Sequence, residues 1–105
     1  MHHQVFGRAR LEWLFEQFRE QADDLLAQLA EALQLDDLYE VGELAHKLVG
    51  SCQTLGLVEA AERALALEAV SRQETAAQCE TLCAEFNAAL ERNLASARKA
   101  FTDRD

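Results

Sequence analysis

Apolar residues recur every three or four positions along nearly the whole chain, and this spacing constrains the fold more than any other feature. Positions three and four residues apart lie on one face of an α-helix, so the pattern predicts amphipathic helices. The chain of 105 residues contains 19 alanines and 17 leucines, but only five valines and no isoleucine or proline. These counts favour helices over strands and predict an all-α fold.

The first half of the chain predicts two long helices. An unbroken apolar stripe places the first helix over residues 9–34, and we expect residues 1–7 to form a short extra helical turn or a frayed end. A polar break follows, where Asp37 and the glutamate three residues later have the spacing of a capping box. The second helix then covers residues 38–55, and Gly56 supplies the left-handed residue that ends it.

The second half predicts one shorter and one longer helix. The apolar spacing resumes after Gly56 and continues to Ser71, which forms a second possible capping box with Glu74. The apolar stripe of the last helix begins at Ala76 and the helix reaches about residue 101, and a cap at Ser71 would place Arg72 in this helix. Four amphipathic helices with short connections pack most simply as an up-and-down antiparallel four-helix bundle, which we expect to be one domain over residues 1–105.

Most large apolar residues fit the core of such a bundle. We expect the stripe of the third helix to include Leu65, and we expect core or interhelix positions for Trp13, Phe15, Phe18, Tyr39 and Phe86. Cys79 and Cys83 are four residues apart on the apolar stripe of the last helix, where cysteine packs as a small hydrophobic residue. We therefore expect no metal site there, and no disulfide framework from an odd set of three cysteines.

The charge balance excludes several classes of partner. Ten basic and nineteen acidic residues give a net charge of −9, which repels nucleic acid and anionic membrane surfaces and weakly favours a monomer. The chain lacks an apolar run of the ~20 residues needed to cross a bilayer, and it lacks the layout of a signal peptide. We therefore expect a cytoplasmic protein.

His46 is the residue that first suggests a site. It lies one position beyond the apolar stripe of the second helix, so we expect it at the surface, on the same face as Gly42, Glu43, Val49, Gly50 and Gln53. A glycine inside a helix costs up to about 1 kcal/mol relative to alanine. Gly50 either lets another molecule approach His46 closely or packs against a neighbouring helix, and the spacing leaves both explanations open.

Glu68 is a carboxylate on the otherwise apolar stripe of the third helix, where such a group usually has a partner. If the second and third helices are antiparallel about Gly56, His46 and Glu68 lie at similar heights. A hydrogen bond from the imidazole Nδ1–H to Glu68 is then feasible and would leave Nε2 free. The alternative is that Glu68 extends into solvent.

The residues around His46 form a longer motif. Residues 45–57 read AHKLVGSCQTLGL and residues 66–68 read ALE. This motif resembles that of histidine-containing phosphotransfer (HPt) domains, which is usually A-H-x-L-K-G-S, then a glycine several residues on, then a helix ending in L-E. The resemblance covers the middle of the chain tightly and the whole chain in helix order and length. It implies a four-helix phosphorelay carrier without an ATP site or kinase domain of its own.

The resemblance also implies roles for particular residues. The Nε2 atom of His46 would take a phosphoryl group from an aspartyl phosphate on one receiver domain and pass it to another, while Glu68 would orient the ring. Gly50 would let the receiver approach, and Arg72 would contact the phosphoryl group or the receiver. The implied docking face also includes Glu43, Lys47, Val49 and Gln53. The implied partners are response-regulator receiver domains and a hybrid sensor kinase, with Mg²⁺ in the receiver and no cofactor in this chain.

The chain departs from the family at Val49, where a lysine usually stands three residues after the histidine. Either Lys47, Arg72 or solvent then neutralises a phosphoryl group, or phosphohistidine is less stable in this chain. Lys47 is about 100° around the helix from His46 and reaches the site poorly, so it is at best a partial substitute. Val49 would instead enlarge an apolar docking patch. The departure keeps two other functions open, a helical docking module that carries no phosphate and a plain structural bundle. A free-standing carrier and a domain of a hybrid sensor kinase both fit the length.

Overall fold

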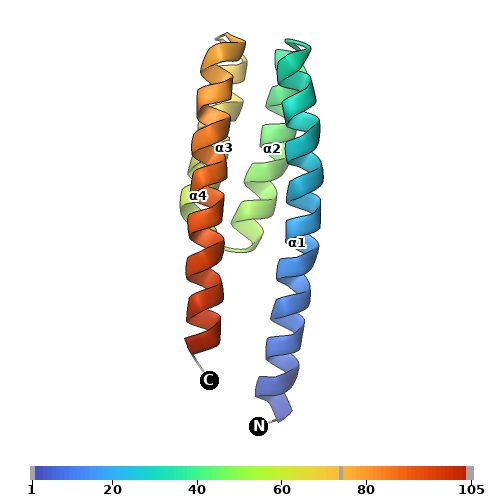
Figure 1. Cartoon of the computed structure of the whole chain (residues 1–105), viewed down its shortest axis with the longest axis vertical. Coiled ribbons are helices and arrows are strands. Elements are labelled where there is room, and N and C mark those ends of the chain that lie inside the picture. Colours follow the sequence, from blue (N-terminus) through green and yellow to red (C-terminus); the bar gives the residue numbers. More distant parts are fainter. Residues whose placement is uncertain (1, 74, 104–105) are drawn as a thin grey trace.

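Four helices form the part of the chain that the structure describes. The computed structural model describes the backbone of residues 2–73 and 75–103, and the side chains of residues 7–73 and 75–100. The helices are α1 (His2–Gln34), α2 (Leu38–Thr54), α3 (Val58–Ser71) and α4 (Ala76–Asp103). They run up and down as an antiparallel bundle, in which α1 lies beside α2 and α3 beside α4 (Figure 1). The predicted all-α four-helix bundle is confirmed.

Helix α1 is longer than the sequence predicts. It begins at His2 and continues without a break through the segment expected to form a separate turn or frayed end. No proline interrupts these residues, and a single glycine, Gly7, does not stop the helix. The helix ends at Gln34. In the turn that follows, Asp36 has a φ of 58° in the left-handed region, and the Asp37 N–H donates to the Ala32 carbonyl at 2.9 Å.

The two turns that border α2 follow the predicted chemistry. The Asp37 side chain caps α2 by accepting a hydrogen bond from the Glu40 N–H at 3.2 Å. Gly56 has a φ of +70°, and the next N–H, that of Leu57, donates to the Cys52 carbonyl at 2.9 Å. Gly56 therefore ends α2 as expected and sets the antiparallel hinge between α2 and α3.

The predicted N-terminal cap of α4 is wrong. Ser71 is the last residue of α3, and its buried hydroxyl donates to the Glu68 carbonyl at 2.7 Å instead of capping a new helix. Its expected partner, Glu74, lies outside the described residues. The capping box is formed by Thr75 and Gln78, which exchange hydrogen bonds of 3.3 and 3.4 Å between side chains and backbone N–H groups.

The core lies where the four helices meet. Its largest fully buried apolar side chains include Leu29, Leu44, Leu48, Leu67, Phe86 and Leu90. Phe18 is also buried and Phe15 is half-buried, whereas Trp13 and Tyr39 are exposed, so the core prediction for these two is wrong. Leu65 is exposed too, because the buried face of α3 instead follows Ala60, Ala64, Leu67 and Ser71.

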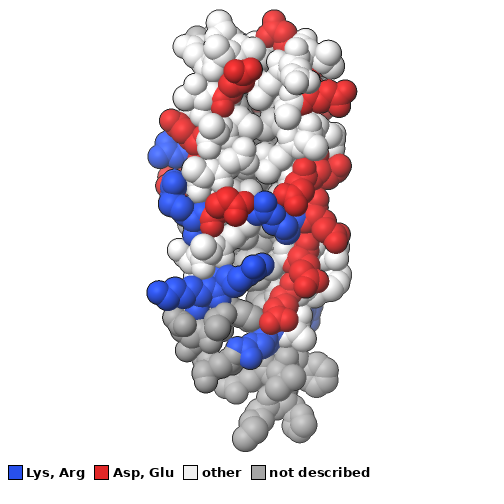
Figure 2. All heavy atoms as spheres, in the orientation of Figure 1, with Lys and Arg blue, Asp and Glu red and all other residues white. Residues whose placement is uncertain are grey.

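The front face of the bundle, formed by α1 and α4, is strongly charged. Acidic side chains gather along α1 and basic side chains on the lower part of α4 (Figure 2). Arg19 of α1 joins these helices through a contact of 2.6 Å to Glu91 of α4, and it also contacts Asp23 within α1 at 3.2 Å. The hydrogen bond to Glu91 is the main reason that the pKa of Arg19 is raised. The pair α2 and α3 lies behind this face (Figure 1).

The start of α3 depends on α4. Leu57 precedes α3 and provides no side-chain cap. Instead, Asn93 of α4 accepts a hydrogen bond from the Ala60 N–H at 2.9 Å. Beside it, Arg92 contacts Glu59 at 2.8 Å and holds the pKa of that carboxyl below its usual value. These contacts tie the hinge end of α3 to α4.

Candidate functional site

His46 stands on the exposed side of α2, and its ring bonds to α3. Its side chain is 72% exposed, and its Nδ1 lies 3.1 Å from Oε2 of Glu68, whose side chain is 12% exposed. Because a carboxylate oxygen accepts hydrogen bonds, this contact requires the proton on Nδ1, and in the neutral ring the lone pair is then on Nε2. The predicted hydrogen bond is confirmed, and the alternative that Glu68 extends into solvent is wrong.

Arg72 shares the carboxylate of Glu68 with His46. Its Nη2 lies 3.2 Å from the same Oε2 atom. Arg72 immediately follows α3 as its C-terminal cap residue, so it lies one turn beyond Glu68 and not in the next helix. One carboxylate oxygen therefore holds an imidazole and a guanidinium together at the surface of the α2–α3 pair.

Glycine occupies positions 42 and 50 near His46 for different structural reasons. Gly42 is buried, and a Cβ there would lie 2.7 Å from the Ser71 hydroxyl oxygen, so it is needed for the close packing of α2 against α3. A Cβ at Gly50 would have nothing within 4 Å. Packing against a neighbouring helix therefore does not explain Gly50, which supports the other interpretation, close approach by a second molecule.

Val49, which was also expected on the exposed face with His46, lies in the core. It is 8% exposed and belongs to the core cluster, because its position between Ala45 and Cys52 turns it toward the inside of the bundle. The expectation that Val49 enlarges an exposed docking patch is therefore wrong. Glu43, Lys47 and Gln53 are exposed as expected.

Two hollows flank His46 along the α2–α3 junction, and the sequence did not reveal either. The hinge-side hollow has a volume of about 330 Å³ and includes Gln53, Val58 and Leu65 in its lining. The hollow on the opposite side, about 420 Å³, includes Tyr39 and Arg72. The sequence could have indicated that Leu65 and Tyr39 lie near the site, because Leu65 lies three residues before Glu68 and Tyr39 seven before His46, on the same helix faces.

The cysteines contribute to packing. Cys52 and Cys79 are buried in the core, and Cys83 is partly buried against it, as expected. Burial raises the pKa of Cys52 to about 11. Within residues 7–73 and 75–100, no group of three or more His, Cys, Asp or Glu side chains is placed to hold a metal ion. In the described part of the chain, every helix is too short or too polar to cross a membrane.

Comparison with known proteins agrees with this geometry. The chain belongs to the Hpt domain family, whose model matches residues 14–99 and so includes His46, Glu68 and Arg72. This family takes part in the phosphorelays of two-component systems, where its members interact with receiver domains and kinases. A stretch of 57 residues is 42% identical to part of the sensor histidine kinase AruS of Pseudomonas aeruginosa. That match covers 54% of this chain but 6% of the length of the kinase. No solved structure matches the chain significantly.

Proposed function

We propose that this chain is a phosphorelay carrier that accepts a phosphoryl group on Nε2 of His46 from a receiver-domain aspartyl phosphate and passes it to another receiver. The observation that carries this proposal is the 3.1 Å contact between Nδ1 of a 72% exposed His46 and Glu68. It combines an accessible ring with a fixed tautomer, which are the two properties that a nitrogen nucleophile needs.

The transfer step follows from the position of the proton. The Nε2 lone pair forms the N–P bond while the P–O bond of the aspartyl phosphate breaks, and the aspartate carboxylate leaves with that electron pair. Because Nδ1 keeps its proton, the phosphorylated ring carries a positive charge. The carboxylate of Glu68 lies 3.1 Å from Nδ1 and stabilises that charge. Transfer to a second receiver is the same step in reverse.

The receiver supplies what the carrier lacks. Phosphoryl transfer depends mainly on positioning and on neutralising the charge of the transferred group. We propose that the receiver brings the Mg²⁺ and that Arg72 contributes a positive charge from this chain. Gly50 provides an unobstructed surface beside His46 for the approach. A hybrid sensor kinase as the source of the phosphoryl group, the monomeric state and the cytoplasmic location stay predictions.

The test is to incubate the chain with phosphorylated receiver domains and Mg²⁺, and to measure acid-labile, base-stable phosphate on the wild type and on His46→Gln. Label on the wild type alone supports the proposal. Label on both proteins, or on neither with a panel of receivers, contradicts it. Binding of a receiver without label would instead favour the docking module that carries no phosphate.

A further inference from the structure

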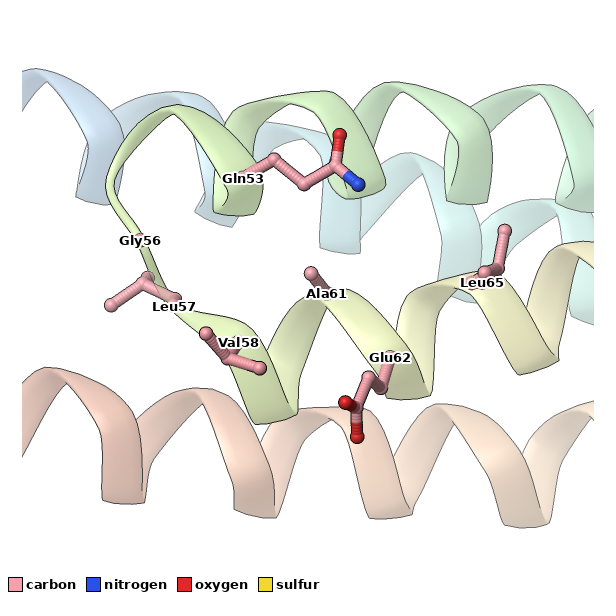
Figure 3. A pocket seen from close by; sticks show the side chains of 7 residues that line it. All are labelled: Gln53, Gly56, Leu57, Val58, Ala61, Glu62 and Leu65. Carbon is pink, nitrogen blue, oxygen red and sulfur yellow. The ribbon is translucent and has the colours of Figure 1, made fainter.

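The hinge-side hollow continues the two helix faces that carry the site. Along α2, Gly50 and Gln53 follow His46 by four and seven residues, and along α3, Leu65 precedes Glu68 by three. Residues at these spacings lie on one helix face, so the junction of α2 and α3 leads directly from the imidazole to the hinge. The hollow opens at that end, where Gln53, Gly56, Val58, Ala61 and Leu65 line it (Figure 3).

The lining of this hollow is mostly apolar. Ala61 and Leu65 point toward α2, whereas Glu62 points away from it toward α4 (Figure 3). Leu65 is 55% exposed and Val58 is also exposed, so two large apolar side chains meet solvent beside a nearly buried floor of Leu57 and Ala61. Exposed apolar side chains that line one hollow near a functional site are typical of an interaction surface.

The hollow on the other side of His46 has a different character. Its lining includes Glu43, Ser71 and Arg72, in addition to Leu38 and the exposed Tyr39. The guanidinium of Arg72 is held there by Glu68 at 3.2 Å. Both linings are mostly apolar, and the two sides of the imidazole differ in charge. The side toward Tyr39 carries Glu43 and Arg72, whereas the charged residue of the hinge-side lining, Glu62, points away from α2 (Figure 3).

We propose that the hinge-side hollow is the apolar anchor for the receiver domain, which therefore lies across α2 and α3 from His46 toward Gly56 and not toward Tyr39. This inference rests on the proposed function. Gly50 supports the orientation, because a Cβ at this position between His46 and the hollow would meet nothing in the chain itself, and its absence clears the path of a partner. The surface that fits is an apolar side chain of the receiver that packs against Val58 and Leu65.

Two substitutions on opposite sides of His46 test the orientation. Leu65→Asp and Tyr39→Asp each place a carboxylate on an exposed apolar position, and Leu35→Asp is the remote control because Leu35 is 70% exposed in the α1–α2 connection. The probe is the receiver domain of the same panel that binds the wild-type chain most tightly, titrated with Mg²⁺ in a calorimeter. We expect Leu65→Asp to weaken binding by about tenfold or more, which corresponds to about 1.4 kcal/mol. Tyr39→Asp and Leu35→Asp should each change the Kd by less than about threefold, or about 0.7 kcal/mol.

Folding is controlled separately. Circular dichroism and thermal unfolding report whether Leu65→Asp keeps the bundle, and Leu65→Gln repeats the test with a residue that favours helix. Gln should also weaken binding, because it cannot fill an apolar contact.

The outcomes separate this inference from the proposed function. If the wild type is labelled and Leu65→Asp binds normally, or if Tyr39→Asp weakens binding as much as Leu65→Asp, the anchor is wrong and the phosphocarrier stands. If Leu65→Asp alone weakens binding but no phosphohistidine forms, the anchor stands and the phosphocarrier fails. If no receiver of the panel binds or labels the wild type, both are contradicted. A wild-type dimer that Leu65→Asp dissociates would assign the hollow to a second copy and overturn the anchor.

Discussion

Replacing Gly50 with alanine should stabilise this protein. Gly50 lies inside α2 with an ordinary negative φ, and a Cβ there would have nothing within 4 Å. Alanine loses less backbone entropy than glycine in a helix, by about 0.5–1 kcal/mol. For a domain of this size 1 kcal/mol raises Tm by roughly 4–8 °C, so we expect a rise of about 2–8 °C in thermal unfolding.

Gly42→Ala is the matched control, because it makes the same chemical change in the same helix. A Cβ at Gly42 would lie 2.7 Å from the Ser71 hydroxyl oxygen, so this variant should lower Tm. The nearest other atom is the Ser71 Cβ at 3.8 Å, an ordinary contact. Gly42→Ala should therefore be better tolerated in a Ser71→Ala background. A lower Tm for Gly50→Ala, or an unchanged Tm for Gly42→Ala, would refute the assignment of the two glycines.

A larger side chain at position 50 should lower the rate of phosphoryl transfer from a receiver. Gly50→Gln adds a long side chain of good helix propensity to the surface beside His46. If a receiver must approach that surface, its transfer rate should fall by about tenfold, or about 1.4 kcal/mol, relative to labelling by a small donor such as phosphoramidate. An unchanged ratio of the two rates would show that Gly50 is not in the path of the receiver.

Three further predictions concern single contacts. Glu68→Ala should slow receiver-driven labelling of His46 by about tenfold, the order of one hydrogen bond to a charged group, and Glu68→Gln should slow it less because an amide oxygen still accepts from Nδ1–H. Asn93→Ala removes the acceptor for the Ala60 N–H and should cost about 0.5–2 kcal/mol in thermal unfolding, whereas the exposed Asn87→Ala should cost little. Because burial raises the pKa of Cys52 to about 11, its thiol should resist alkylation at pH 8 until denaturant is added, and rapid modification of the native protein would contradict this.

The sequence predicts those parts of the fold that depend on residues close together in the chain. Helical spacing located four helices, and the Asp37 cap and Gly56 located two of the turns, because each needs only its own segment. The contact between His46 and Glu68 was also predictable, since an antiparallel hinge at Gly56 brings residues at similar distances from it to the same height.

The errors arose where several helices decide together. Ser71 and Thr75 both have the chemistry of a cap, and the packing of Ser71 against Gly42 decides between them. Apolar spacing alone also cannot tell which edge of a stripe is covered. Leu65 and Tyr39 lie at uncovered edges beside the site, and Val49 lies at a covered one.

The burial of Val49 changes what the missing lysine means. A charge three residues after His46 would start from a position that is 8% exposed and packed against the core. Arg72 is better placed, because Glu68 Oε2 already holds its Nη2 at 3.2 Å and the His46 Nδ1 at 3.1 Å. A phosphoryl group adds nearly two negative charges on Nε2 and would compete for the guanidinium.

A shift of Arg72 to the phosphoryl oxygens would leave Glu68 to the cationic ring, so each new charge would gain its own partner. We therefore predict that Arg72→Ala shortens the lifetime of the phosphorylated protein and that Lys47→Ala does not, measured as loss of label after the receiver is removed. Equal lifetimes for wild type and Arg72→Ala would show that solvent replaces the family's lysine. In that case Arg72 serves to position Glu68, and its removal should affect the rate of transfer instead of the stability of the product.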